Sequence, residues 1–264
     1  MRLKSLIRWR PMALAAMAGM AVWKDSNIAA IAAPADSVPF VGCASDGQMG
    51  PVAPPALQTL QTGMLHVPPS QANRFLAYYA STNLGVLAPR GWHCAGVYGS
   101  NGAALFVTPE KRPPETYLRQ GIKLTGPAIQ LSFAYGDTSG RFEVAGIAGR
   151  IFPAAHDFVQ GVINEGLAPR NDFSFTPFPD DRLVRGGPTE VEFETPANRD
   201  GLGTYSLLAR SDQPIAGVAI LEPGEMNLVL LNVRLPPGLR RFSSAIVQNV
   251  ERNKGNPLGG EGSP

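Results

Sequence analysis

Two cysteines, Cys43 and Cys94, place the strongest constraint on how this chain folds. They are the only cysteines in the sequence, so an oxidising compartment leaves them one intramolecular pairing. Closing a loop of about 50 residues would remove roughly 4 kcal/mol of unfolded-state entropy. The sequence therefore predicts a disulfide that ties an irregular segment to the hairpin that follows it. The alternatives are a reactive thiol and metal ligation.

The beginning of the chain indicates export. A basic start is followed by a small and apolar run over residues 11–23, which is too short to span a bilayer comfortably. The best cleavage site lies at Ala33-Pro34-Ala35; an uncleaved anchor and a true start at Met12 are the alternatives. We expect a periplasmic or secreted protein with no stable membrane span after processing. The expected organisation is a signal peptide over residues 1–35, one exported domain over 36–253 and a disordered tail over 254–264.

Composition describes a globular and nearly neutral domain. Hydrophobic residues make up 44% of the 264 residues and charged residues 17%, which leaves ample material for a core. Five basic residues and one acidic residue precede Asp36, so the full-chain balance of 23 to 21 becomes 18 to 20 in the mature part. No basic stripe remains, and this argues against binding to nucleic acid or to an anionic membrane.

Hydrophobic periodicity predicts an α+β fold with a mainly antiparallel sheet, built from a hairpin and a C-terminal meander, and with helices packed on one side. The alternation over residues 129–135 is typical of a strand with one buried face. Strands are expected over residues 91–98, 103–108, 129–135, 181–185, 190–195, 204–210, 215–221 and 228–235. Helices are expected over residues 71–84, 141–152, 157–166 and about 239–250.

The region around the predicted disulfide is the preferred location for a binding site. Trp92, His93 and Tyr98 would form an aromatic contact surface beside Cys94. The disulfide would also bring Asp46 and Gln48 close to them. For Trp92, His93 and Tyr98, core packing of at least one is the competing interpretation.

Three glutamates alternate with apolar residues along one predicted strand. Glu190, Glu192 and Glu194 would share one strand face, paired across a hairpin with Arg182 and Arg185. The alternatives are a cation site and a glycan site, and glycoside chemistry would need a second carboxylate across a cleft.

Catalytic residues cannot be assigned from the sequence. His66, His93 and His156 lack partners at metal-ligand spacing, so we expect no metal and no cofactor. We expect instead a non-enzymatic binding or interaction protein of the cell envelope, with an envelope protein or polymer as its partner. The alternative is an envelope hydrolase that uses Cys94 or the carboxylates of residues 180–194.

Three segments, over residues 40–51, 91–102 and 235–252, resemble a family of small exported bacterial proteins without assigned activity. The resemblance covers most of the mature chain. It implies export but no activity, and it assigns no functional residue.

Overall fold

The computed structural model describes residues 38–57 and 72–254. The export signal predicted over residues 1–35 lies outside these ranges, as does the predicted tail beyond Lys254. No helix in the described part of the chain combines the length and the apolar character needed to cross a bilayer. The α+β class, the mainly antiparallel pairing and the C-terminal meander are confirmed.

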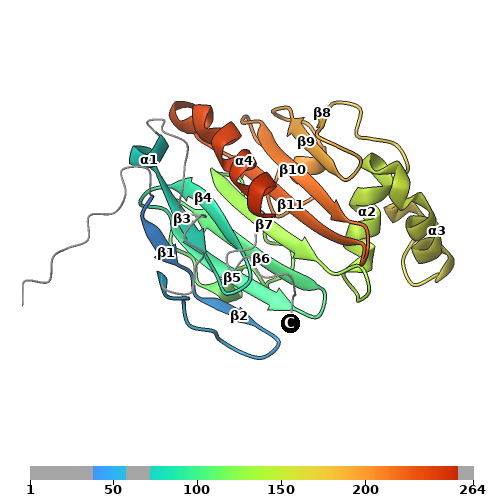
Figure 1. Ribbon diagram of the computed structural model, residues 1–264, viewed down its shortest axis with the longest axis horizontal. Helices are drawn as coiled ribbons and strands as arrows, with labels where there is room; N and C mark the ends of the chain where they lie inside the picture. The colour runs from blue at the N-terminus through green and yellow to red at the C-terminus, as the bar shows by residue number, and fades with distance from the viewer. Residues whose placement is uncertain (1–37, 58–71, 255–264) are drawn as a thin grey trace, which may run out of the picture. The chain divides into compact units, whose positions relative to one another are not determined.

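A large sheet of eight strands forms the centre of the domain (Figure 1). Its strands are β2 (Ser45–Gly47), β5 (His93–Gly99), β6 (Gly102–Thr108), β7 (Ala128–Ala134), β8 (Arg182–Arg185), β9 (Glu190–Thr195), β10 (Ile215–Glu222) and β11 (Asn227–Arg234). Their order in space is β2-β5-β6-β7-β11-β10-β9-β8, and only β2 and β5 pair in parallel. The predicted hairpin is β5 and β6, and the meander runs from β8 to β11.

A second sheet replaces the helix predicted over residues 71–84. Only α1 (Ala72–Phe75) is helical there, and the chain continues into β3 (Leu76–Ala80) and β4 (Gly85–Pro89), with β1 (Phe40–Gly42) parallel to β3. The prediction is wrong because β3 is buried along its whole length and hydrogen-bonded to a strand on each side. A helical reading of its apolar spacing ignored this two-sided burial.

The remaining helices lie close to their predicted positions. They are α2 (Arg141–Ile151), α3 (His156–Asn164) and α4 (Ser243–Asn253), and a 3₁₀ helix over Pro237–Phe242 leads directly into α4. The last helix carries an apolar stripe on the side that faces the sheet, since Phe242, Ile246 and Val250 are all buried.

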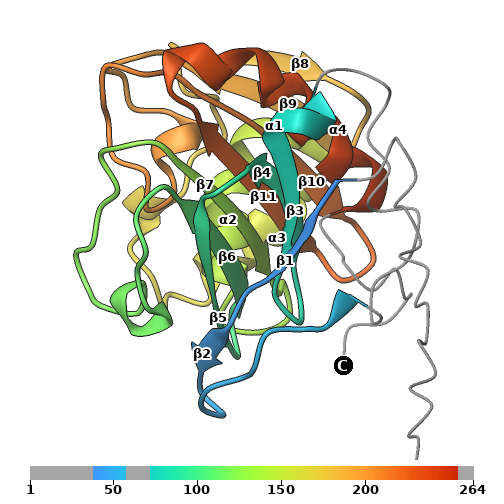
Figure 2. The ribbon, with the colours of Figure 1, turned by 90° about the vertical axis from the view of Figure 1, so that its left-hand side faces the viewer.

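The two faces of the large sheet carry separate cores. Val218 and its cross-strand neighbour Leu231 face the small sheet and α4. Ala219 and Leu230, one residue further along each strand, face α2 and α3. Figure 2 shows α4 and the small sheet on the same side of the large sheet. The expectation that all helices pack on one side is therefore wrong: α2 and α3 cover the face opposite α4.

A buried arginine organises the segment that was predicted as a strand over residues 204–210. That segment is irregular, and its β-pairing among the described residues is an isolated parallel bridge between Leu124 and Leu208. Arg234, fully buried at the end of β11, donates hydrogen bonds to the carbonyl oxygens of Leu124, Gly126 and Ala209. Its guanidinium group thus supplies the donors that a neighbouring strand would otherwise provide.

Replacing Arg234 with Met should lower the free energy of unfolding by about 3 kcal/mol, because several buried carbonyl groups would lose their donor. Chemical denaturation followed by circular dichroism measures this change. Arg210→Met is the matched control, because Arg210 is exposed in an ion pair with Asp200 and should cost less than about 1 kcal/mol. Equal losses in the two variants would contradict the role given to Arg234.

Candidate functional site

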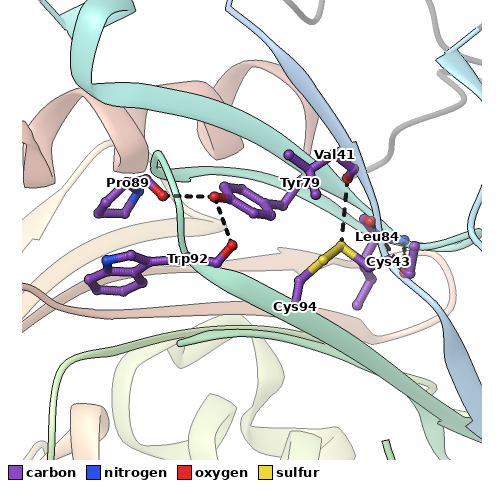
Figure 3. Close-up of a disulfide and its surroundings, with 8 residues drawn as sticks. Val41, Cys43, Tyr79, Leu84, Pro89, Trp92 and Cys94 are labelled. Atoms are coloured by element: carbon purple, nitrogen blue, oxygen red, sulfur yellow. Dashed lines mark hydrogen bonds between the residues drawn. A yellow bond between two sulfur atoms is a disulfide. The ribbon is translucent and has the colours of Figure 1, made fainter. Parts of the chain in front are cut away.

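The predicted disulfide is present, and it joins Cys43, which directly follows β1, to Cys94 in β5. Cys43 and Cys94 are bonded, and neither sulfur is free (Figure 3). Beside the bond, the hydroxyl of Tyr79 donates to the carbonyl oxygens of Pro89, at 2.8 Å, and Trp92, at 3.2 Å. This arrangement leaves no thiolate for nucleophilic catalysis, so the hydrolase hypothesis based on Cys94 is not supported.

The aromatic residues proposed for binding do not converge. Trp92 packs against the core shared by the two sheets, whereas His93 is exposed and points to the opposite face of β5. Tyr98 lies at the far end of β5, where its hydroxyl donates to the carbonyl oxygen of Gly50 at 2.6 Å. The structure therefore separates Trp92, His93 and Tyr98 along one strand.

Asp46 and Gln48 lie near Tyr98, and each contacts the protein's own chain. The Gln48 amide bonds both the backbone N–H and the hydroxyl of Ser100, at 2.9 and 3.3 Å. A carboxylate oxygen of Asp46 accepts a hydrogen bond from the backbone N–H of Gly47. The Gln48 contacts fasten the turn after β2 to the β5–β6 turn, and the Asp46 contact is local to β2. A ligand-binding role for Asp46, Gln48 and the three aromatic residues stays a prediction.

Replacing both Cys43 and Cys94 with Ala should lower the free energy of unfolding by about 2–4 kcal/mol, because the unfolded chain would gain freedom. Urea denaturation of the two proteins, with retained β-sheet signal in circular dichroism as the folding check, measures the loss. An unchanged midpoint would contradict a stabilising role for the bond.

The three glutamates of β9 face α4. The register pairs Glu194 with Arg182 and Glu192 with Val184, on the face that also carries Val218 of β10. The predicted Arg182–Glu194 pair is confirmed, with 3.5 Å between guanidinium and carboxylate. The predicted role of Arg185 is wrong. Arg185 lies three residues beyond Arg182, therefore on the other face, and donates to the carbonyl oxygen of Ile151.

A groove of about 400 Å³ opens between these strands and α4. We call it the α4 groove. Its walls are β8 and β9 on one side and the 3₁₀ helix with the first turns of α4 on the other; the ends of β10 and β11 complete it. Its lining residues are Arg182, Val184, Glu192, Phe193, Glu194, Pro214, Ala216, Gly217, Val233, Leu235, Arg240, Arg241, Ser243, Ser244 and Val247. Its lining combines apolar side chains with a few charged and hydroxyl groups, as ligand pockets do.

Arg240 and Arg241 lie in the 3₁₀ helix that precedes α4, and neither has a carboxylate partner among the described residues. Arg240 donates to the side-chain oxygen of the neutral Gln213. Arg241 stacks over the rings of Phe75 and Phe242, at 5.3 and 4.7 Å from their centres. No ion pair joins either arginine to an acidic residue in the part of the chain that the structure describes. The two guanidinium groups are therefore available to an anion from solution.

Glu251, in the last turns of α4, lies near the glutamates of β9. Burial raises the pKa of Glu251 from its ordinary value of 4.5 to about 7, and the negative charges of Glu192 and Glu190 add to the rise. Glu251 therefore keeps its proton until the pH approaches neutrality.

Replacing Glu251 with Gln should make the protein more stable above pH 7 and leave it unchanged below about pH 4.5. The folded state keeps a proton on Glu251 that the unfolded state releases, so wild-type stability falls as the pH rises from about 4.5 to about 7. Glutamine cannot ionise, and it has nearly the same size and shape as glutamate. After solvent screening of this partly exposed group, we expect a gain of about 1 kcal/mol at alkaline pH.

Urea denaturation of wild type and Glu251→Gln across this pH range tests the expectation. Glu222→Gln is the control, because Glu222 lies on the same sheet face and accepts from Asn227. A difference between Glu251→Gln and wild type that stays constant with pH would contradict the raised pKa of Glu251.

Asp180 and Asp181, which directly precede β8, have structural roles. Asp181 accepts hydrogen bonds from the hydroxyl of Thr195, at 2.6 Å, and from the N–H of Leu202, at 2.8 Å. Burial raises its pKa, while these two hydrogen bonds act in the opposite direction. Asp180 forms an ion pair with Arg199. Both acids therefore fix the segment that follows β9, and neither lines the α4 groove.

The histidines give no metal centre. A ring nitrogen of His156 lies 3.2 Å from the carbonyl oxygen of Gly149, and its ring meets Phe175 edge-on. His66 lies outside the described residues. Over residues 38–57 and 72–254, no three His, Cys, Asp or Glu side chains are placed to hold a metal ion together.

Sequence reasoning found Glu192 but missed the α4 groove, Arg240, Arg241 and Glu251. The last of these follows Val250 of the predicted apolar stripe by one residue, which was the only available signal that it lies beside the sheet. No protein-family model, curated protein sequence or solved structure matches the chain. The function therefore has to be argued from the geometry of the α4 groove.

Proposed function

We propose that this is an exported binding protein of the cell envelope, without enzymatic activity, whose ligand occupies the α4 groove. The leader pattern of the sequence and the disulfide support an oxidising location. The observation that carries the proposal is the pairing of an apolar groove with two arginines that have no acidic partner among the described residues.

The lining defines the chemistry of the ligand. Val233, Leu235 and Val247 supply apolar surface, and Arg240 and Arg241 supply positive charge beside the hydroxyls of Ser243 and Ser244. A small molecule with an oxyanion on an apolar body complements both parts. A purely apolar ligand would leave the guanidinium groups unused, and a purely ionic one would leave the aliphatic side chains in water.

The proposal moves the binding site away from the residues around Cys94. Those side chains diverge along β5 or bond to the protein's own backbone, whereas the α4 groove brings together groups from four strands and two helical segments. An envelope protein or polymer that presents an acidic and apolar group would meet the same requirement.

The alternative is a carboxylate-dependent hydrolase, and the observation in its favour is the Glu192–Glu251 pair. A glycosidase needs two carboxyl groups about 5 Å or more apart, so that the scissile bond fits between them. Of Glu192 and Glu251, only Glu192 lines the groove, so this pair does not flank a substrate bound there. Release of p-nitrophenol from ester or glycoside substrates, lost in Glu192→Gln, would favour this alternative over the binding function.

Isothermal titration calorimetry with 1-decanesulfonate, an ionised head on an apolar chain, tests the binding function. We expect saturable binding below the micelle concentration, weakened about tenfold in Arg241→Ala by the loss of a charge-assisted contact. Ser244→Trp should abolish binding by filling the groove.

Each variant has a matched control. Arg170→Ala removes a different arginine that is also stacked on an aromatic ring, and Gln248→Trp adds the same bulk one turn further along α4, outside the groove. Both should bind like wild type. Absence of binding to wild type, or equal binding to all five proteins, would overturn the proposed function.

A further inference from the structure

Two aromatic rings hold Arg241 at the α4 groove. Phe75, the last residue of α1, and Phe242, in the 3₁₀ helix, lie with their ring centres 5.3 Å apart and their planes inclined by 30°. The guanidinium carbon of Arg241 lies 5.3 Å from the centre of the first ring and 4.7 Å from the centre of the second. Because Arg241 lines the groove and Phe75 does not, the ring of Phe75 can act on a ligand through Arg241.

The two rings differ in their surroundings. Phe242 is buried in the core that the large sheet shares with α4. Phe75 is 39% exposed, and the ring contacts described for it are those with Phe242 and Arg241. Core packing therefore accounts for Phe242, whereas the contact with a cation distinguishes Phe75.

The ring contacts fix the side chain of Arg241 without neutralising its charge. An aromatic face attracts a guanidinium group through its quadrupole, and it brings no carboxylate oxygen to occupy the N–H donors. Arg240, the other arginine of the 3₁₀ helix, is likewise held by a neutral group, the side chain of Gln213. An arginine that is already held in place loses less conformational freedom when it binds an anion. The charge of Arg241 is thus both positioned and available.

We infer that Phe75 is a positioning residue of the α4 groove, and that its ring holds the guanidinium group of Arg241 where this group binds the anionic head of the ligand. This role rests on the proposed function. It extends the site beyond the lining of the groove to α1, and it makes the affinity for an anion depend on the aromatic character of position 75. An aliphatic side chain there would fill space but would leave Arg241 free to turn away from the groove.

Isothermal titration calorimetry with 1-decanesulfonate measures the effect. Phe75→Leu should bind about threefold more weakly than wild type, because it keeps an apolar side chain and loses the aromatic face. Phe75→Tyr keeps that face and should bind like wild type. Pentafluorophenylalanine at position 75 keeps the ring but removes its negative face, so binding should again weaken about threefold. A packing role alone would leave the affinity of this fluorinated protein unchanged.

A double-mutant cycle assigns the loss to Arg241. Phe75→Leu should have no further effect in the Arg241→Ala background, since the cation that the ring holds is then absent. Phe175→Leu is the matched control, because it removes a ring that lies beside Arg170, outside the groove, and it should bind like wild type. Circular dichroism checks that each variant is folded.

The outcomes separate this role from the proposed function. Wild-type affinity in both Phe75→Leu and the fluorinated protein would overturn the positioning role and leave the binding function standing. An equal loss from Phe75→Leu with and without Arg241, or a loss in Phe75→Tyr as large as that in Phe75→Leu, would have the same meaning. Absence of binding to wild type would overturn the binding function and the positioning role together.

Discussion

Burial of β11 on both of its faces is the constraint on which the rest of the domain depends. All eight residues of this strand are buried, and their alternation divides them between two cores. One set meets the small sheet and α4, and the other meets α2 and α3. Because α4 packs on β10, β11 and β4, its outer side and the strands β8 and β9 form the walls of the α4 groove. The groove therefore forms beside the core that the large sheet shares with α4, where β8 and β9 extend past the helix.

The sequence predicted those elements whose periodicity reflects a single local environment. β7 alternates because its apolar residues face the large core, although the polar residues Gln130 and Ser132 on its other face are buried as well. α4 carries its apolar stripe because it lies on a sheet. The prediction failed for β3 because this strand pairs with a strand on each side and is buried on both faces, so its local apolar spacing does not indicate its structure. The segment over residues 204–210 has the composition of a strand, but the carbonyl oxygen of Ala209 accepts a hydrogen bond from Arg234, which no local pattern encodes.

The candidate site was predictable only in part, because its residues come from distant segments. The pairing of Cys43 with Cys94 followed from counting, and the shared face of the β9 glutamates followed from alternation. The same alternation should have excluded Arg185 as a partner, since an odd separation from Arg182 places it on the other face. Glu251 lies about 60 residues beyond Glu192, and only the packing of α4 brings Glu251 close enough to feel the charge of Glu192.

The exposed edge of the large sheet has a further consequence for solubility. β8 is an outer strand of four residues, and its Val184 is 63% exposed, with an arginine at each end of the strand. An unpaired strand edge is a template for adding a strand from another molecule, and such addition leads to aggregation. Arginines at both ends of β8 mean that a second copy arriving edge to edge would bring like charges together. The short cationic edge therefore opposes strand addition at a place where an apolar strand would favour it.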